Sequence, residues 1–280
     1  MTSNKGSFQV YDESFDEISY ERLIFSGGEV QVKITGHVSQ RKAITIEAHL
    51  SSSDLLIELL LLTEAIRRMT RQPIKLICPY FPYARQDRVM NPGEALAVKV
   101  IAQLINNLGF DSVEVWDVHS DVTLALLDRA VNYPPQTWVQ MIPVDKSKTI
   151  LVAPDAGAMK KVGAVAKGLG FEMISAEKKR NTKTGEITGT VVHAGVGVHA
   201  GNYDFLVVDD ICDGGRTFTE LAKELKKLTT GRILLYVTHG IFSKGLGVFG
   251  DIDHIYTAMP FPGVDLTSDK LTHLKYDRTQ

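Results

Sequence analysis

The chain has 280 residues, of which 44% are hydrophobic, and this suits one large or two ordinary domains with full cores. Its 31 Lys and Arg residues nearly balance its 33 Asp and Glu residues, and the net charge of −2 gives no basic field that would attract nucleic acid or an anionic membrane. The N-terminus has no secretory-signal pattern, and the densest apolar run, LLIELLLL, is too short to span a bilayer. Cys78 and Cys212 have neither metal-ligand nor disulfide-framework spacing, which favours a reducing compartment. We therefore expect a soluble, cytoplasmic protein that binds neither nucleic acid nor a membrane.

Short apolar runs alternate with helical patterns along the chain, which predicts repeated βα units on mostly parallel sheets. The expected strands are 31–34, 43–48, 74–78, 112–116, 149–152, 171–175, 205–208 and 232–237. The clearest expected helices are 54–69, 96–108, 158–169 and 219–228. The proline-rich segment NYPPQTWVQMIP, residues 132–143, interrupts the pattern near its midpoint. We expect two similar α/β domains, 1–140 and 141–280, although no sequence repeat is strong enough to show a duplication.

The run CPYFPYARQDR, residues 78–88, follows an expected strand with aromatic, proline and cationic residues. Prolines and tyrosines often line an ordinary surface loop. The functional interpretation is a nucleotide site, because aromatic rings offer flat surfaces to a base, Gln86 offers an amide, and Arg85 and Arg88 offer guanidinium groups to phosphates. We favour the nucleotide site.

In VEVWDVHSD, Asp117 and His119 are two residues apart at an expected strand end, so their side chains should share a face. A lone histidine is more often structural. Beside a carboxylate at the carboxyl end of a parallel strand, where open sheets bind ligands, it indicates a magnesium or nucleotide contact. Since imidazole is an unusual direct ligand of magnesium, we expect a water molecule between them.

Two further stretches carry weaker signals. In APDAGAMKK, Asp155 follows a strand and offers a second metal contact, while the backbone of 156–158 offers N–H groups to diphosphate oxygens. In AEKKRNTKTGEITGT, residues 176–190, the cations form either a solvated face or a mobile hairpin lid. As a lid, Lys178 and Arg180 would close over a transferring phosphoryl group and offset its growing charge.

The stretch VVDDICDGGRTF, residues 207–218, runs from a buried strand into acids, two glycines and a helix that Thr217 or Thr219 would cap. A DG turn between a strand and a helix is also an ordinary structural connection in α/β proteins. A glycine turn before a helix also presents free N–H groups and a positive dipole end to an anion. Asp209 and Asp210, expected at the strand end, would then face sugar hydroxyls or magnesium. The combination favours a phosphorylated sugar.

Taken in order, YFPYARQDR, DVH, PDAG, KKR and the DD-acid-glycine loop resemble the ribose-phosphate diphosphokinase family, from about Ile24 to the end of THGIFSKG at Gly245. The resemblance implies two similar phosphoribosyltransferase-like lobes, each a mostly parallel sheet flanked by helices. It implies transfer of the β,γ-diphosphate of ATP to the anomeric hydroxyl of ribose 5-phosphate, giving phosphoribosyl pyrophosphate and AMP. Mg2+ is the implied cofactor. The implied assembly is a ring-like homo-oligomer built from dimers, often a hexamer.

By the same resemblance, the motifs assign residues to four roles. The ATP-binding residues are Phe25, Glu29, Arg85, Gln86 and Asp87. The metal-facing residues are Asp117, His119 and Asp155, and the catalytic pair is Lys178 and Arg180. The ribose 5-phosphate residues are Asp209, Asp210, Asp213, Gly214, Gly215, Arg216 and Thr217.

The chain departs from the family pattern at several positions. Gly27 stands where the family usually has an acid, and Ala156 where it commonly has histidine. Arg216 stands where a small residue is usual, and we expect it to add a charge-assisted phosphate contact. The THGIFSKG stretch also differs near the family's regulatory site.

Two other classes of protein compete with this hypothesis. A phosphoribosyltransferase shares the acid-glycine loop but has no use for ARQDR. A non-catalytic synthetase-associated subunit would be expected to lose the lid cations or the metal-facing histidine, whereas this chain keeps Lys178, Arg180 and His119. The sequence therefore favours the synthetase.

Overall fold

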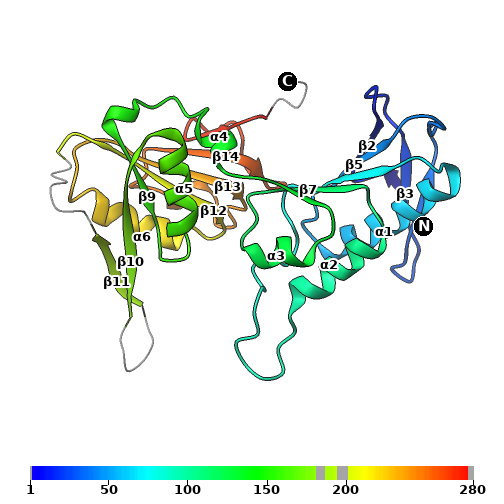
Figure 1. The fold of residues 1–280 in the computed structure, drawn as a ribbon, viewed down its shortest axis with the longest axis horizontal. Helices are drawn as coiled ribbons and strands as arrows, with labels where there is room; N and C mark the ends of the chain where they lie inside the picture. The colour runs from blue at the N-terminus through cyan, green and yellow to red at the C-terminus, as the bar shows by residue number, and fades with distance from the viewer. Residues whose placement is uncertain (1, 181–186, 194–200, 277–280) are drawn as a thin grey trace. The chain divides into compact units, whose positions relative to one another are not determined.

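The computed structural model describes residues 2–180, 187–193 and 201–276 (Figure 1). Within these ranges it describes every side chain except those of residues 2–3, 178–180, 187–190 and 193. The chain forms two compact units, Met1–Pro134 and Pro135–Gln280. The division falls inside the proline-rich segment 132–143 but before residue 140. The division lies before residue 140 because helix α4 (Gln136–Val139) packs into the second unit. Its Trp138 is completely buried and makes an edge-to-face contact with Tyr276.

The first unit is built on a five-stranded sheet with the order β2-β5-β6-β7-β8. Strands β5 to β8 are parallel, and β2 pairs antiparallel with β5. The strands are β2 (Gln9–Asp12), β5 (Ile44–Glu47), β6 (Ile74–Ile77), β7 (Ser112–Trp116) and β8 (Ala130–Tyr133). The connecting helices are α1 (Ser53–Met69), α2 (Ala97–Asn107) and α3 (Asp121–Leu126). Each crossover returns the chain to the same sheet edge, so the carboxyl ends of β5, β6 and β7 lie along one edge.

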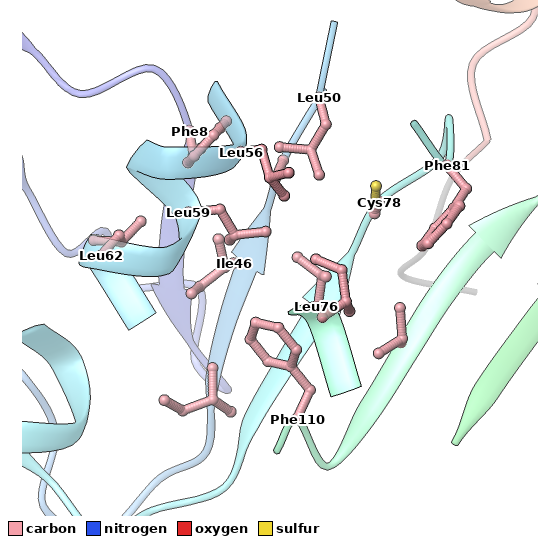
Figure 2. Close-up of a cluster of buried hydrophobic side chains, with 14 of the residues drawn as sticks. Phe8, Ile46, Leu50, Leu56, Leu59, Leu62, Leu76, Cys78, Phe81 and Phe110 are labelled. Carbon is pink, nitrogen blue, oxygen red and sulfur yellow. The ribbon is translucent and has the colours of Figure 1, made fainter. Parts of the chain in front are cut away.

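Helix α1 covers the core of this unit. Its apolar residues recur at helical spacing, and Leu56, Leu59 and Leu62 are buried against Ile46 of β5 and Leu76 of β6 (Figure 2). The Ser52 hydroxyl caps the helix by accepting a hydrogen bond from the Leu55 N–H at 3.4 Å. Only residues 48–52 join β5 to α1, so the start of α1 lies near the carboxyl end of β5.

A second, antiparallel sheet of three strands packs on α1, with the order β1-β3-β4. Its strands are β1 (Thr2–Lys5), β3 (Tyr20–Ile24) and β4 (Val30–Ile34). The fully buried Glu58 of α1 accepts hydrogen bonds at 2.8 Å from Ser7 N, Ser7 Oγ and Tyr20 Oη. It also forms an ion pair with Arg22 Nε at 2.9 Å. Burial and the neighbouring Glu58 raise the pKa of Tyr20, so its hydroxyl stays a donor in this network.

The second unit is built on a seven-stranded sheet with the order β11-β10-β9-β12-β13-β14-β15. All neighbours are parallel except β10 and β11, which form an antiparallel pair. The strands are β9 (Thr149–Ala153), β10 (Glu172–Arg180), β11 (Ile187–His193), β12 (Asp204–Cys212), β13 (Ile233–Gly240), β14 (His254–Pro260) and β15 (Leu271–His273). The helices besides α4 are α5 (Met159–Leu169), α6 (Arg216–Leu225) and the 3-10 turns Lys146–Lys148 and Leu246–Val248. Both β9 and β13 are buried at every position, as expected for central strands of a parallel sheet covered on both faces.

The eight expected strands and four expected helices are all present, which confirms the α/β fold class. Two boundaries differ at the predicted sugar-phosphate loop. Strand β12 continues to Cys212, so Asp209 and Asp210 lie within the strand, because parallel pairing with β13 extends through Cys212. Helix α6 begins at Arg216 after Gly215, whose φ of +78° only glycine adopts readily, so neither predicted threonine is the cap. No helix in the described ranges is long and apolar enough to cross a membrane.

We predict that Glu58→Ala lowers the free energy of unfolding by about 3–5 kcal/mol, because it leaves the buried partners of Glu58 without a counter-charge or acceptor. The matched control is Glu64→Ala on the same helix, whose exposed carboxylate pairs with Arg68 at 2.6 Å. We expect the control to stay within about 0.5 kcal/mol of the wild type in urea unfolding. Equal losses in the two variants would contradict a stabilising role of the buried network.

Candidate functional site

The ARQDR loop follows β6 and borders a concave pocket of the first unit. The pocket has a volume of about 550 Å³ and is lined by Leu50, Ser51, Ser52, Ser53, Tyr80, Pro82, Tyr83, Arg85 and Gln86. Tyr83 has a φ of +61°, and the turn is closed by a 2.9 Å hydrogen bond from Gln86 N to Tyr83 O. The Tyr83 hydroxyl lies 2.8 Å from Ser53 Oγ, which ties the loop to the start of α1. Aromatic, hydroxyl, amide and guanidinium groups thus line one pocket, as a nucleotide site requires.

Asp87 connects this loop to the segment after β7. Its side chain is buried, with Arg88 Nε donating to Oδ1 at 3.0 Å. The hydrogen bond from Arg88 lowers the pKa of Asp87 and outweighs the opposing effect of burial, and the charges of Arg88 and His119 act in the same direction as the hydrogen bond. Asp87 is therefore an ionised group that holds the loop beside His119.

The expectation that Asp117 and His119 share a face is wrong. Strand β7 ends at Trp116, and Asp117 adopts a φ of +44°, which ends the alternation of side chains along the strand. Asp117 is 1% exposed, and its N–H donates to Tyr133 O at 2.8 Å, whereas His119 is exposed. Of the two, His119 is the one that a ligand in solvent reaches.

Phe25 and Glu29 lie at the turn between β3 and β4. Phe25 N donates to Glu29 O at 2.9 Å, and Gly28, with a φ of +90°, completes the turn. Both side chains are exposed. The turn belongs to the three-stranded sheet, whereas Arg85 and Gln86 follow a strand of the five-stranded sheet, so the predicted ATP residues come from two different sheets.

Three carboxylates of the second unit come close together. Asp209 and Asp210 lie near the end of β12, and Asp155 follows the neighbouring strand β9. Burial, and then the negative charges of Asp210 and Asp155, raise the pKa of Asp209 well above its usual range. Lys161 Nζ lies 3.6 Å from Asp210 Oδ2, and Asp155 Oδ1 accepts a 3.1 Å hydrogen bond from Ala158 N at the start of α5. The site concentrates negative charge that a cation or hydroxyl donors would stabilise.

The acid-glycine loop runs directly into α6. Gly215 is packed so closely that a Cβ there would lie 2.5 Å from Phe249 Cζ. Since α6 begins at Arg216, the N–H groups at the first turn of the helix, including that of Thr217, face the loop. Arg216 is exposed and donates from Nε to Glu220 Oε1 at 2.7 Å, so its guanidinium pairs along the helix surface. The pair uses only Nε of the guanidinium, so the expected phosphate contact of Arg216 stays a prediction.

The predicted lid residues lie on β10. In the β10–β11 pair, Lys178 is opposite Thr190 and Arg180 is opposite Ile187. The strands therefore form the two sides of the expected hairpin. The side chains of Lys178 and Arg180, and the segment 181–186, lie outside the described residues.

Among the described residues, no three His, Cys, Asp or Glu side chains form a ready metal cage. Mg2+ usually keeps several water ligands and binds through one or two carboxylates together with substrate phosphates. The oxygen ligands of Asp155, Asp209 and Asp210 fit that mode, and their mutual repulsion is what a divalent cation would relieve.

Sequence comparison supplies the family. A model of the N-terminal domain of ribose phosphate pyrophosphokinase matches residues 15–109. The ribose-phosphate pyrophosphokinase of Pyrococcus furiosus is 34% identical over 224 residues, which cover 79% of this chain and 77% of the relative. The chain belongs to the ribose-phosphate pyrophosphokinase family. The ribose-phosphate pyrophosphokinase of Pasteurella multocida is 32% identical over 225 residues, 78% of this chain and 70% of the relative.

The fold agrees with the family. A crystal structure of phosphoribosylpyrophosphate synthetase from Mycobacterium smegmatis has a TM-score of 0.74 at 20% identity and covers 93% of this chain and 87% of that one. This likeness confirms a mixed α/β architecture with parallel sheets flanked by helices. The sequence relatives confirm the resemblance carried by the motifs.

Sequence reasoning missed several residues of these sites. The serines 51–53 were available as a polar run before the first expected helix, and Lys161 as a cation one helical turn after PDAG. Ser243 donates from Oγ to Asp213 Oδ1 at 2.7 Å, across 30 positions of the chain. No local pattern predicts that contact, because it depends on how the ends of β12 and β13 meet.

We predict that Gly215→Ala destabilises the second unit by about 1–3 kcal/mol, because alanine must take a left-handed φ and its Cβ collides with Phe249. Gly214→Ala is the matched control, since a Cβ there meets the Lys244 side chain at an ordinary 3.6 Å. Thermal unfolding should separate the two variants. Similar unfolding temperatures would contradict the packing described for the loop.

Proposed function

We propose that this chain is a ribose-phosphate diphosphokinase, which transfers the β,γ-diphosphate of ATP to the anomeric hydroxyl of ribose 5-phosphate. The observation that carries the proposal is the pocket lined by Arg85 and Gln86, because the ARQDR loop has no use in a phosphoribosyltransferase. The carboxylates and the glycine loop of the second unit support a phosphorylated sugar as acceptor. Family membership supports both assignments.

The reaction forms a bond between the anomeric oxygen and the β-phosphorus. It breaks the bond from the β-phosphorus to the oxygen that bridges it to the α-phosphorus, and that oxygen leaves with AMP while the anomeric hydroxyl loses its proton. The aromatic and polar lining around Tyr83, Arg85 and Gln86 would hold the nucleotide, with Phe25 and Glu29 as further ATP contacts. Asp209 and Asp210 would accept hydrogen bonds from ribose hydroxyls, while the backbone of Asp213 to Thr217 binds the 5-phosphate. Positioning supplies most of the acceleration in such transfers.

Lys178 and Arg180 are proposed as the cations that offset charge on the transferring group. Mg2+ is the proposed cofactor, and when bound it neutralises phosphate charge and lowers the pKa of coordinated hydroxyls. Asp155 is its proposed carboxylate contact, and His119 a contact through water. Asp117, which is buried, would support the position of His119 from within the protein.

The proposed enzyme is located in the cytoplasm and assembles from several copies of this chain. The sequence predicts a cytoplasmic protein, and the resemblance predicts a homo-oligomer built from dimers, as large as a hexamer. Light scattering of the purified protein measures the assembly directly. The second candidate functions, phosphoribosyl transfer and a non-catalytic subunit, predict no AMP from ATP and ribose 5-phosphate.

The deciding experiment mixes the protein with ATP, ribose 5-phosphate and Mg2+ and quantifies AMP and phosphoribosyl pyrophosphate by chromatography. We expect equal amounts of both products, and a fall in kcat of at least about a hundredfold for Lys178→Ala. Lys179→Ala, at the adjacent position of the same strand, is the matched control and should keep most activity. Without AMP formation by the wild type, the synthetase assignment fails.

We further predict that EDTA abolishes the reaction and that added Mg2+ restores it. Asp155→Asn should raise the Mg2+ concentration needed for half-maximal rate by about tenfold, because one carboxylate contact is lost. Asp251→Asn, at an exposed position of the same unit, should leave that concentration unchanged. An unaltered Mg2+ requirement in Asp155→Asn would exclude Asp155 as a metal contact.

A further inference from the structure

The segment after β13 is fixed against the acid-glycine loop. The N–H groups of Ile241 and Phe242 both donate to Cys212 O, at 2.9 and 3.1 Å. Ser243 adds a backbone bond to Asp213 O at 3.2 Å besides its side-chain bond to the Asp213 carboxylate at 2.7 Å. These contacts determine where the next residue, Lys244, begins.

The side chain of Lys244 extends along the loop. A Cβ built on Gly214 would lie 3.6 Å from Lys244 Cε, 3.7 Å from Cδ and 3.9 Å from Cγ, so the aliphatic stem covers the Gly214 backbone. Lys244 is exposed, and its ammonium forms no hydrogen bond or ion pair with any described residue. Arg216, the other cation at this loop, is already paired with Glu220 at 2.7 Å.

We propose that Lys244 is a specificity-determining residue that binds the 5-phosphate of the sugar substrate. This inference rests on the proposed function, which makes the loop the phosphate site. Glycines at 214 and 215 let a phosphate monoester approach the backbone N–H groups at the start of α6, where the helix dipole favours an anion. The Lys244 ammonium, one bond beyond Cε, adds a full positive charge at the rim of that loop. The pairing is a charge-assisted hydrogen bond to a dianion, a role in which lysine acts as a point charge.

The test compares Lys244→Gln and Lys244→Arg with Lys223→Gln, a matched loss of one exposed lysine on α6. For Lys244→Gln we expect the KM for ribose 5-phosphate to rise about tenfold, while kcat and the KM for ATP stay within twofold. Lys244→Arg should recover most of the affinity, and Lys223→Gln should match the wild type. An unchanged KM for ribose 5-phosphate in Lys244→Gln overturns the proposal, as does a fall in kcat alone.

Calorimetric titration with ribose 5-phosphate separates this proposal from the proposed function. If the wild type makes no phosphoribosyl pyrophosphate, the synthetase assignment fails, but the titration still measures the phosphate contact. Binding of ribose 5-phosphate weakened about tenfold in Lys244→Gln and not in Lys223→Gln supports the role of Lys244. Equal dissociation constants in all variants, or no binding to the wild type, overturn it.

Discussion

The parallel pairing of β12 with β9 on one side and β13 on the other is the constraint from which the candidate site of the second unit follows. Because parallel strands end at the same edge, this pairing brings Asp155, the acids of β12 and the segment after β13 to one place. It also extends β12 past Asp209, which forces a carboxylate into partly buried surroundings beside two others. The raised pKa of Asp209 is the electrostatic cost of that arrangement, and burial makes its largest contribution. A purely structural strand would not need these acids, so their presence supports a role toward a ligand.

In the first unit, one helix, α1, packs against two sheets. One of its faces covers the five-stranded sheet, and the small antiparallel sheet packs on another. The apolar face of α1 packs on β5 and β6, while Glu58 on the same helix receives hydrogen bonds from Ser7 and Tyr20 and an ion pair from Arg22. A buried carboxylate with several donors specifies one position of the small sheet, since any displacement would leave the charge unpaired. The Glu58 network therefore also fixes the position of the turn that carries Phe25 and Glu29. The predicted ATP contacts Phe25 and Glu29 therefore depend on Glu58, which is not itself a proposed substrate contact.

Much of the fold could be predicted from the sequence, because long apolar runs indicate buried strands and apolar residues at helical spacing indicate helices with one buried face. Strands β1, β2 and β3 could not, since they are short and carry many polar residues, and β3 is bound through Tyr20 and Arg22 to Glu58 far along the chain. Strands β8, β14 and β15 are also absent from the expected set. The predicted start of α6 is too late because a threonine hydroxyl can accept a cap hydrogen bond and so draws the prediction, whereas here packing against Phe249 and a left-handed φ admit only glycine as the cap. Motifs gave the candidate residues of the site, but the partners Ser243 and Lys244 depend on contacts between strand ends that no local pattern records.

Backbone strain is distributed in a way that agrees with these assignments. Of the five non-glycine residues with positive φ in the described chain, Tyr83 lies in the pocket loop, Asp117 precedes His119, and Phe242 precedes Ser243 and Lys244. A left-handed φ costs about 1–3 kcal/mol for such residues and persists only where surrounding contacts fix it. At Phe242 the fixing contacts are its hydrogen bond to Cys212 O and its edge-to-face packing with Phe249, which also lies beneath Gly215. The aromatic pair Phe242 and Phe249 thus packs against the glycine loop and fixes the direction in which the chain reaches Lys244. The shape of the phosphate loop and the position of Lys244, its nearest unpaired cation among the described residues, therefore depend on the same contacts.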